Sequence, residues 1–285
     1  MISEAPWRLE IRHATGFRYE SDVTASHNEV RLSPLHTDRQ WVMDHRVEVE
    51  PVARLARFTD YWGTTVFAFD IRRPHRELSV VATTLVESGS AAVAIGDGWP
   101  WAEFADADRQ DEWCEFLMPT PFTEADEAIG GLAEMARAAK SPARAVELVD
   151  ALVRDSLEYR KGVTTVETTA AEALAGGAGV CQDFVHLGLS VLRHAGIPCR
   201  YASGYLSPRA EAYIGETVEG ESHAWLEAWV GHWLAIDLTN GRPVGPDHVV
   251  VARGRDYSDV PPLRGIYHGG RAEHLEVTVQ VTRRA

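Results

Sequence analysis

A long apolar helix that begins at a cysteine is the feature that most constrains how this chain can fold. From residue 181 to residue 194, apolar side chains recur at i, i+3, i+4 and i+7, a spacing that predicts a buried helix. Gly196 follows as the expected C-terminal cap. A glycine-rich turn at residues 176–180 leads into the helix and places Cys181 in its first turn. The unpaired amide groups and positive dipole end of that turn stabilise a thiolate, so Cys181 is a candidate nucleophile.

Two aromatic strands come next, and each carries one polar residue of interest. His223 lies in the alternating stretch 222–229, and Asp237 lies in the stretch 233–238. A three-residue loop between the strands would put both side chains on one face, diagonal to each other and within hydrogen-bonding reach. A two-residue turn would put them on opposite faces. If the two residues act together, the hairpin must have an odd loop or a bulge.

Cys181, His223 and Asp237 are the three residue types that thiol acyl-transfer chemistry requires. In such a triad the histidine takes the thiol proton or forms an ion pair with the thiolate, and the aspartate fixes the imidazole tautomer and stabilises its charged form. The backbone amide of Cys181 is the expected first donor to an oxyanion, and Tyr159 is the candidate for a second. The sequence therefore predicts an enzyme with a thiol nucleophile.

The chain divides into a strand-rich part and a helix-rich part. Residues 1–95 are predicted to form an antiparallel β domain with strands separated by turn signals. Its strands are expected near residues 7–13, 42–49, 64–71 and 78–87. Residues 96–285 are predicted to form the catalytic domain, with helical character in the acidic segment 102–115 and a helix over 141–157. The alternating segment 273–283 is expected to be a strand that can return to the β domain.

The composition and net charge of the chain limit which partners it can bind and in which compartment it is expected. Hydrophobic residues make up 45% and charged residues 25% of the chain, as in soluble globular proteins. A net charge of −14 opposes binding to nucleic acid. The first twenty residues lack the pattern of a signal peptide, and no apolar run reaches the roughly 18 residues that span a bilayer. We therefore expect a cytoplasmic protein with no membrane or nucleic-acid partner.

The three cysteines do not suggest a disulfide framework, because they are few, scattered and odd in number. Cys199 follows a proline at the start of an apolar strand and is predicted to be a core residue. Cys114 lies among acidic residues and is assigned a structural role. A reducing compartment would keep the Cys181 thiol free.

Several motifs of this chain resemble those of the bacterial transglutaminase-like superfamily, in the same order and with the same spacing. They are residues 179–184, 195–205, 223–227 and 233–239. The N-terminal region is similar to the bacterial transglutaminase-associated N-terminal domain, notably at residues 60–64 and 73–75. Many bacterial members of this superfamily are described as cysteine proteases. The resemblance covers nearly the whole chain and is most specific between residues 140 and 242.

The resemblance implies an α+β fold with a papain-like core, in which the nucleophile helix packs on an antiparallel sheet and an antiparallel β domain precedes the core. It carries Cys181 over as nucleophile, His223 as general base and acid, and Asp237 as orienter. Family members attack carboxamides, form a thioester and pass the acyl group to water or to an amine. Cysteine-dependent amide hydrolysis or acyl transfer on peptide-like substrates is therefore expected. A peptidase or amidase is favoured over a cross-linking transglutaminase.

Two departures from animal transglutaminases matter. Those enzymes carry a tryptophan well upstream of the cysteine that helps to hold the oxyanion, whereas this chain has none between Trp113 and Cys181. Carboxylates at the spacing of a calcium loop are also missing, so calcium activation is not expected. A metal-dependent hydrolase that uses His268 and His274 or His232 is disfavoured, because the chain has no HExxH pattern and no close His/Cys pair, and no cofactor is expected.

Some alternatives remain open from the sequence. Trp225 and Glu221 are candidates for the wall of the substrate cleft. Glu227 shares a strand face with His223 and could serve the site or act as a structural partner. The expected partner is a peptide or protein amide, with an amine as the alternative acceptor. A non-catalytic binding or assembly protein with the same fold is the rival interpretation, and an intact Cys, His and Asp set disfavours it.

Overall fold

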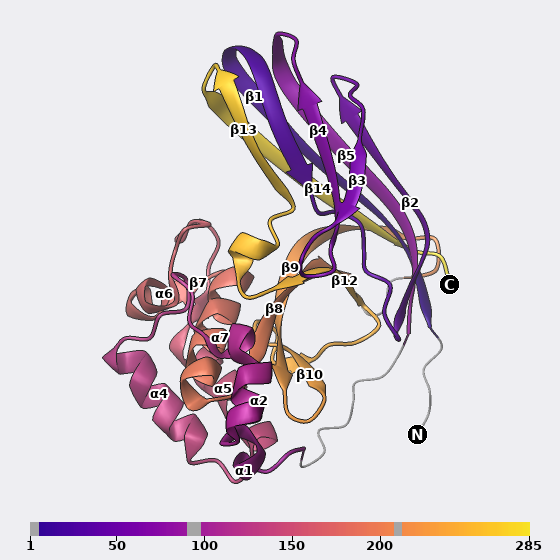
Figure 1. Ribbon diagram of the computed structural model, residues 1–285. Helices are drawn as coiled ribbons and strands as arrows, with labels where there is room; N and C mark the ends of the chain where they lie inside the picture. Colours follow the sequence, from indigo (N-terminus) through magenta and orange to yellow (C-terminus); the bar gives the residue numbers. More distant parts are fainter. Residues whose placement is uncertain (1–5, 90–97, 208–212) are drawn as a thin grey trace.

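A computed structural model describes residues 6–89, 98–207 and 213–285 of the chain. Figure 1 shows a tall, twisted antiparallel sheet above a group of helices that packs against a second, smaller group of strands. The upper sheet contains β1 (Trp7–Val30), β2 (Gln40–Glu50), β3 (Ala56–Thr59), β4 (Thr65–Ile71), β5 (His75–Ser88), β13 (Leu263–Gly269) and β14 (Ala272–Arg283). Strands and helices are largely segregated, as in the predicted α+β class.

β1 is the strand on which the upper sheet is built. It runs for 24 residues, against the roughly 5 to 6 of a typical strand, and pairs with four others. Its first half lies between β5 and β14, with Leu9 opposite both Val86 and Arg283. Its second half pairs with β4 and β13. The four predicted strands lie within β1, β2, β4 and β5, whereas β3 and most of the length of β1 were not predicted.

The helix-rich part holds the remaining elements. The helices are α1 (Trp101–Phe104), α2 (Ala107–Glu112), α3 (Cys114–Leu117), α4 (Glu127–Arg137), α5 (Pro142–Ser156), α6 (Ala170–Gly176) and α7 (Cys181–Ala195), with the 3-10 turn η1 (Tyr257–Asp259). The strands are β8 (Cys199–Leu206), β9 (Thr217–Trp229), β10 (Trp233–Asp237), β11 (Arg242–Pro243) and β12 (His248–Gly254), with the parallel pair β6 (Glu158–Tyr159) and β7 (Ala178–Gly179).

The acidic segment predicted to be helical is broken into α1, α2 and α3 rather than forming one helix. Asp106 adopts an extended backbone conformation, and its side chain accepts a hydrogen bond from the amide of Arg109. This is the geometry of an N-cap, so Asp106 starts a new helix where the pattern alone suggested continuity. The predicted start of α5 is found as expected, with Ser141 as N-cap and Pro142 at the first position.

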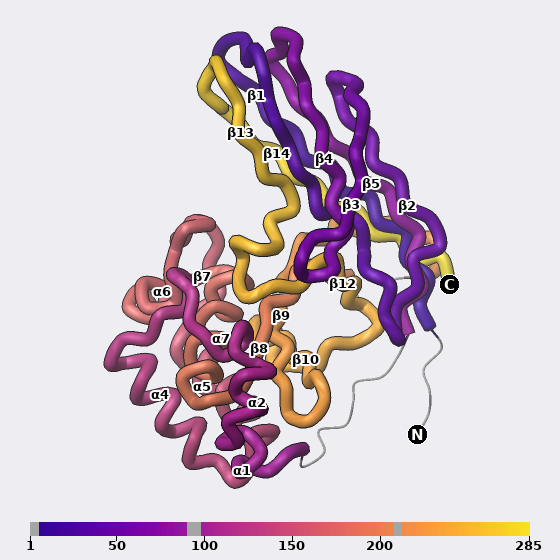
Figure 2. The backbone as a smooth tube through the Cα atoms, in the orientation of Figure 1, coloured from indigo at the N-terminus to yellow at the C-terminus, as the bar shows by residue number. Residues whose placement is uncertain are grey.

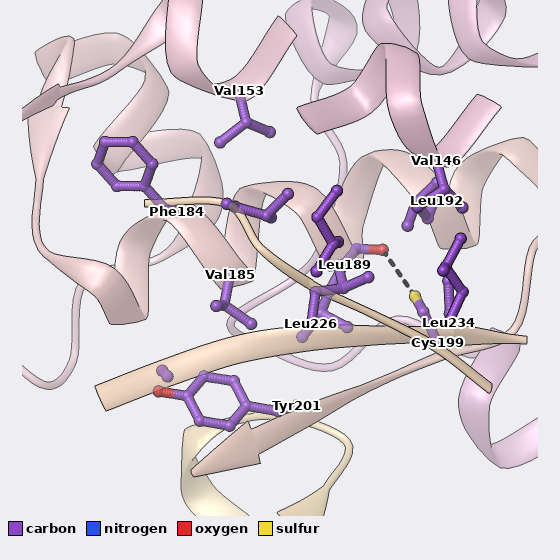
Figure 3. Close-up of a cluster of buried hydrophobic side chains, with 14 of the residues drawn as sticks. Val146, Val153, Phe184, Val185, Leu189, Leu192, Cys199, Tyr201, Leu226 and Leu234 are labelled. Carbon is purple, nitrogen blue, oxygen red and sulfur yellow. Dashed lines mark hydrogen bonds between the residues drawn. The ribbon is translucent and has the colours of Figure 1, made fainter. Parts of the chain in front are cut away.

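α7 is the central helix of the lower half, and it begins and ends where the sequence predicts. Its apolar side chains pack between the neighbouring helices and the sheet (Figure 3). At Gly188 an added Cβ would lie 2.4 Å from Leu238 Cδ1 and 3.1 Å from Leu226 Cδ1, so any larger residue would have to displace the Leu238 side chain from its place between helix and sheet. Cys199 is buried beside the helix and its thiol donates to Leu189 O at 3.6 Å. Burial raises its pKa to about 11, which makes it a packing cysteine as predicted.

β9 joins the two halves of the molecule into one sheet. Its first residues pair with β14, with Val218 opposite Val281, and its later residues pair with β8 and β10. Figure 2 shows the C-terminal segment running beside β1, although the two are far apart in the sequence. The C-terminal strand thus returns to the N-terminal sheet. The predicted domain boundary near residue 95 falls in the segment 90–97, outside the described residues, and stays a prediction.

No helix in the described ranges combines the length and the apolar character that crossing a membrane requires.

A partly buried ion cluster joins β8, β9 and β12 of the small sheet. The carboxylate of Glu227 is contacted by Arg200 at 2.6 Å and by Arg253 at 2.8 and 3.0 Å. Burial alone would raise the pKa of Glu227, but the two guanidinium groups outweigh it and lower the pKa. Arg200 also lies over the ring of Trp233 at 3.7 Å from its centroid. Glu227 is therefore a structural partner of two strands, one of the two roles left open by the sequence.

Replacing Glu227 by alanine should destabilise the protein by about 3 to 5 kcal/mol, because it leaves two partly buried guanidinium groups without their counter-ion. The free energy of unfolding in guanidinium chloride measures this. Glu221→Ala is the matched control, because its ion pair with Lys161 is exposed and should be worth less than about 1 kcal/mol. Equal losses in the two variants would contradict a structural role for Glu227.

Candidate active site

The turn before α7 is shaped so that Cys181 opens the helix. Asp183 Oδ2 folds back and accepts hydrogen bonds from the Val180 amide and from Thr164 Oγ1, both at 2.7 Å. A Cβ on Gly179 would lie 2.6 Å from Asp183 atoms, so this contact requires the glycine. Cys181 is half-buried and sits where the first amide groups of the helix are unpaired. The predicted setting of the cysteine is therefore present.

The β9–β10 hairpin sets the register of the histidine and the aspartate. Trp233 pairs with Trp229, which leaves a loop of three residues, 230–232. The amide of Val230 donates to His232 O across this loop at 2.9 Å. The odd loop is thus confirmed, and it puts His223 and Asp237 on one face. His223 Nε2 lies 2.9 Å from Asp237 Oδ2, and both side chains are buried.

His223 also reaches the thiol of Cys181. Burial lowers the pKa of His223, but hydrogen bonds to Asp237 and to Cys181 outweigh it and raise the pKa to about 10. Because Nε2 faces Asp237, Nδ1 is the ring nitrogen left for the sulfur. The structure therefore brings together the three residues that the sequence singled out, in the order thiol, imidazole, carboxylate.

Asp237 is a fully buried carboxylate with a dense set of partners. Its Oδ1 accepts from the amides of Thr239 and Asn240, both at 3.2 Å. Its Oδ2 accepts from Asn240 Nδ2 at 2.7 Å and contacts His248 Nε2 at 3.1 Å, in addition to His223. Burial would raise the pKa of Asp237, but these hydrogen bonds hold it well below its usual range. The carboxylate is thus an anion and acts only as an acceptor.

Asn240 and His248 are site residues that the sequence did not reveal. Asn240 had a usable signal, because a short polar residue just after a strand commonly binds a nearby acceptor or turns the chain. His248 had none, since it lies on another strand, β12, and reaches Asp237 only through the fold.

The lower-ranked site predictions fare differently. Tyr159 pairs with Gly179 beside the nucleophile turn and is 42% exposed. Burial, with Cys181 and Glu221 nearby, raises its pKa, so the hydroxyl stays protonated and its role as an oxyanion donor stays a prediction. Glu221 is exposed and paired with Lys161, and its place at the substrate cleft stays a prediction. Trp225 is 1% exposed, which argues against direct contact with a peptide substrate.

The donor atoms of His223, Asp237 and His248 lie within 4.8 Å of one another, a spacing that could also hold a metal ion. Each imidazole nitrogen already lies at hydrogen-bonding distance from Asp237 Oδ2. Hydrogen bonds donated by His223 Nε2 and His248 Nε2 to Asp237 therefore account for the short distances between these groups. The expectation that the site works without a metal or cofactor stays a prediction.

Comparisons with known proteins agree with this architecture. The family described as the bacterial transglutaminase-like N-terminal region matches residues 9–87. The transglutaminase-like superfamily matches residues 131–238, which include Cys181, His223 and Asp237.

Relatives span nearly the whole chain. "Uncharacterized protein ML0607" of Mycobacterium leprae is 43% identical over 98% of this chain and 100% of its own length. "Uncharacterized protein Rv2569c" of Mycobacterium tuberculosis is 31% identical over 96% of this chain and 92% of its own. A crystal structure of a Cytophaga hutchinsonii protein, described as a "Putative Cysteine Protease", has the same fold. It superimposes with a TM-score of 0.78 at 20% identity and covers 98% of this chain and 91% of that one.

The two family matches cover both halves of the molecule, and the fold is that of a structural neighbour across almost its full length. The chain belongs to the transglutaminase-like superfamily and carries its bacterial N-terminal region.

Proposed function

We propose that the protein is a cysteine-dependent amide hydrolase or acyltransferase that acts on peptide-like substrates through a thioester. One observation carries the proposal: the Cys181 thiol, in the first turn of α7, lies within hydrogen-bonding reach of His223, whose other ring nitrogen is 2.9 Å from the Asp237 carboxylate. A nucleophile, a base and an orienter in contact form the arrangement that activates a thiol.

In the first half-reaction, the Cys181 thiolate, paired with the His223 imidazolium that the raised pKa implies, attacks the carbonyl carbon of the amide. The oxygen of the tetrahedral intermediate is stabilised by the Cys181 amide, with Tyr159 as the candidate second donor. The C–N bond then breaks, and the leaving amine takes the proton from the imidazolium of His223. Asp237 stays ionised throughout and holds the ring. The product is a thioester on Cys181.

In the second half-reaction, water or an amine attacks the thioester carbonyl. His223 takes a proton from the attacking group, the C–S bond breaks, and Cys181 leaves as a thiolate that pairs again with the His223 imidazolium. Exposed neighbours such as Tyr159 and Glu221 give water access to this region, which favours hydrolysis over transfer to an amine. The description of the Cytophaga hutchinsonii protein as a cysteine protease points in the same direction.

A reducing compartment suits this chemistry, and we propose the cytoplasm. All three cysteines lie in the described part of the chain and are free thiols: Cys114 is exposed, Cys181 half-buried and Cys199 buried. An oxidising environment would expose the nucleophile to loss by oxidation.

Iodoacetamide labelling at pH 6, followed by mass spectrometry, tests the proposed nucleophile. An ordinary thiol with a pKa of about 8.5 is less than about 1% ionised at that pH. We expect Cys181 to react faster than the exposed Cys114 in the same molecule and to slow about tenfold or more in His223→Ala. Peptide amides would then be screened with and without added amines.

The control for this experiment is His274→Ala, which removes an exposed imidazole from β14 in the upper sheet and should leave both labelling rates unchanged. Slow labelling of Cys181 that is the same in wild type and His223→Ala would favour the non-catalytic binding protein instead.

The stability of the protein should depend on pH through His223. The pKa of His223 is about 10 in the folded protein, against 6.5 for an unperturbed histidine, so its stabilisation is complete below about pH 6.5 and is lost as the pH rises towards 10. Asp237, with a lowered pKa, stabilises the folded protein above about pH 4 and loses this stabilisation only as the pH falls further.

The stability difference between wild type and His223→Gln should therefore be largest near pH 6 and shrink by pH 9.5. Urea unfolding at both pH values measures it; a difference that stays constant would contradict the raised pKa.

A further inference from the structure

A second imidazole binds the same carboxylate oxygen as the proposed catalytic base. His248, the first residue of β12, has a fully buried side chain, and its Nε2 lies 3.1 Å from Asp237 Oδ2. We propose that His248 is a positioning residue that holds the Asp237 carboxylate in the orientation in which Oδ2 meets the ring of His223. The inference rests on the proposed function, because it assigns His248 to the same triad.

The hydrogen-bond partners of His248 fix which ring nitrogen donates to Asp237. Nδ1 lies 3.2 Å from the Gly245 amide nitrogen and 2.9 Å from Asp247 Oδ1. A neutral ring that accepts from Gly245 carries its proton on Nε2, and a charged ring that donates to Asp247 carries one there as well. Because Asp237 is an acceptor only, Nε2–H is the donor in both cases. A bare Nε2 would set a lone pair against the anion.

The far side of the ring is anchored by a second ion pair. Asp247 Oδ2 contacts Arg242 Nη2 at 2.6 Å. Burial would raise the pKa of Asp247, but its bonds to His248 and Arg242 lower it to about 2. Arg242 lies on β11 directly opposite Asp237 in the β10–β11 pair. The contacts run in a ring: Asp237 binds His248, His248 contacts Asp247, and Asp247 binds Arg242. Arg242 then pairs with Asp237 through the β10–β11 backbone.

Packing restricts the ring as well. Trp225 meets the His248 ring edge-on, with centroids 5.4 Å apart and planes at 83°. Trp225 is on β9, two residues beyond His223, and is almost fully buried. The buried tryptophan thus supports the site indirectly: it holds His248, and His248 holds Asp237.

His248 serves to orient the Asp237 carboxylate more than to neutralise its charge. Without it, Asp237 would still accept from Asn240 Nδ2 and from two backbone amides, so the anion would remain hydrogen-bonded. The last torsion of an aspartate side chain has a broad energy minimum, however, so these donors alone allow the carboxylate to turn. The His248 ring, held in place by the fold, supplies a donor from a third direction and prevents this rotation of the carboxylate.

A cavity beside His248 makes this inference open to chemical rescue. It has a volume of about 420 Å³, and His248, Trp225, Gly245 and Val250 are among the residues that line it. Truncation of His248 would extend this cavity to Asp237. Free imidazole could then occupy the vacated position and restore the missing N–H donor.

The test compares His248→Gln, His248→Phe and His248→Ala, using iodoacetamide labelling of Cys181 and NMR titration of the His223 ring. Glutamine keeps a donor near the position of Nε2, phenylalanine keeps the shape without a donor, and alanine leaves space. We expect labelling to slow on the order of tenfold in the Phe and Ala variants, within the range found for outer-shell residues of metal sites. Labelling should be retained largely in His248→Gln and should recover in His248→Ala on addition of imidazole. The pKa of His223 should fall in His248→Phe, because the carboxylate no longer faces its ring.

The matched control is His232→Phe, a histidine that lines the same cavity and has no contact with Asp237 among the described residues. Circular dichroism and thermal unfolding check that each variant folds, and the imidazole rescue gives a result even if the Phe variant does not. Wild-type rates in folded His248→Phe, equal loss in the Gln and Phe variants, or a rise in the His223 pKa would overturn the inference. Failure of the proposed function would look different, since wild type itself would then show no His223-dependent labelling.

Discussion

The buried carboxylate of Asp237 is the group on which the arrangement of the site depends. An ion without solvent exposure is tolerated only where hydrogen bonds replace water, and its partners in the described structure come from three places. His223 is on β9, the amides and Asn240 are in the turn after β10, and His248 is on β12. The register of these strands is therefore tied to one charge, and a slip of one residue would leave it unpaired.

The nucleophile is placed beside this carboxylate by the packing of α7 on the sheet and by the turn that precedes the helix. Gly188 removes the side chain that would separate α7 from Leu226 and Leu238, and Gly179 lets Asp183 fold back over the turn before the helix. Both glycines act through the space that a Cβ would fill. The result is that the first turn of α7, with its unpaired amides, lies beside the His223 ring.

The local features of the site could be predicted from the sequence, and the long-range ones could not. The limits of α7 follow from periodicity, a property of neighbouring residues. The parity of strand residues left a two-residue and an odd loop open, and the assumption that His223 and Asp237 act together selected the odd loop that the structure has. The full length of β1 was missed because its second half is defined by pairing with β13, which lies near the other end of the chain. His248 was missed for the same reason, since nothing near it in the sequence indicates that it meets Asp237. The acidic helix was predicted as continuous because a capping aspartate looks like any other acidic residue within a charged segment.

The sharing of one carboxylate by two histidines has a consequence for where the proton resides during the reaction. Each hydrogen bond that Asp237 accepts makes the anion more stable and less basic, which is why its pKa lies so far below the usual range. Such a carboxylate does not take the proton from His223; it stabilises the imidazolium by its charge while leaving the proton on the ring. The proton is then available to the amine that must leave when the amide bond breaks. The donor from His248 therefore fixes the direction of the carboxylate that faces the ring, while the proton stays on His223.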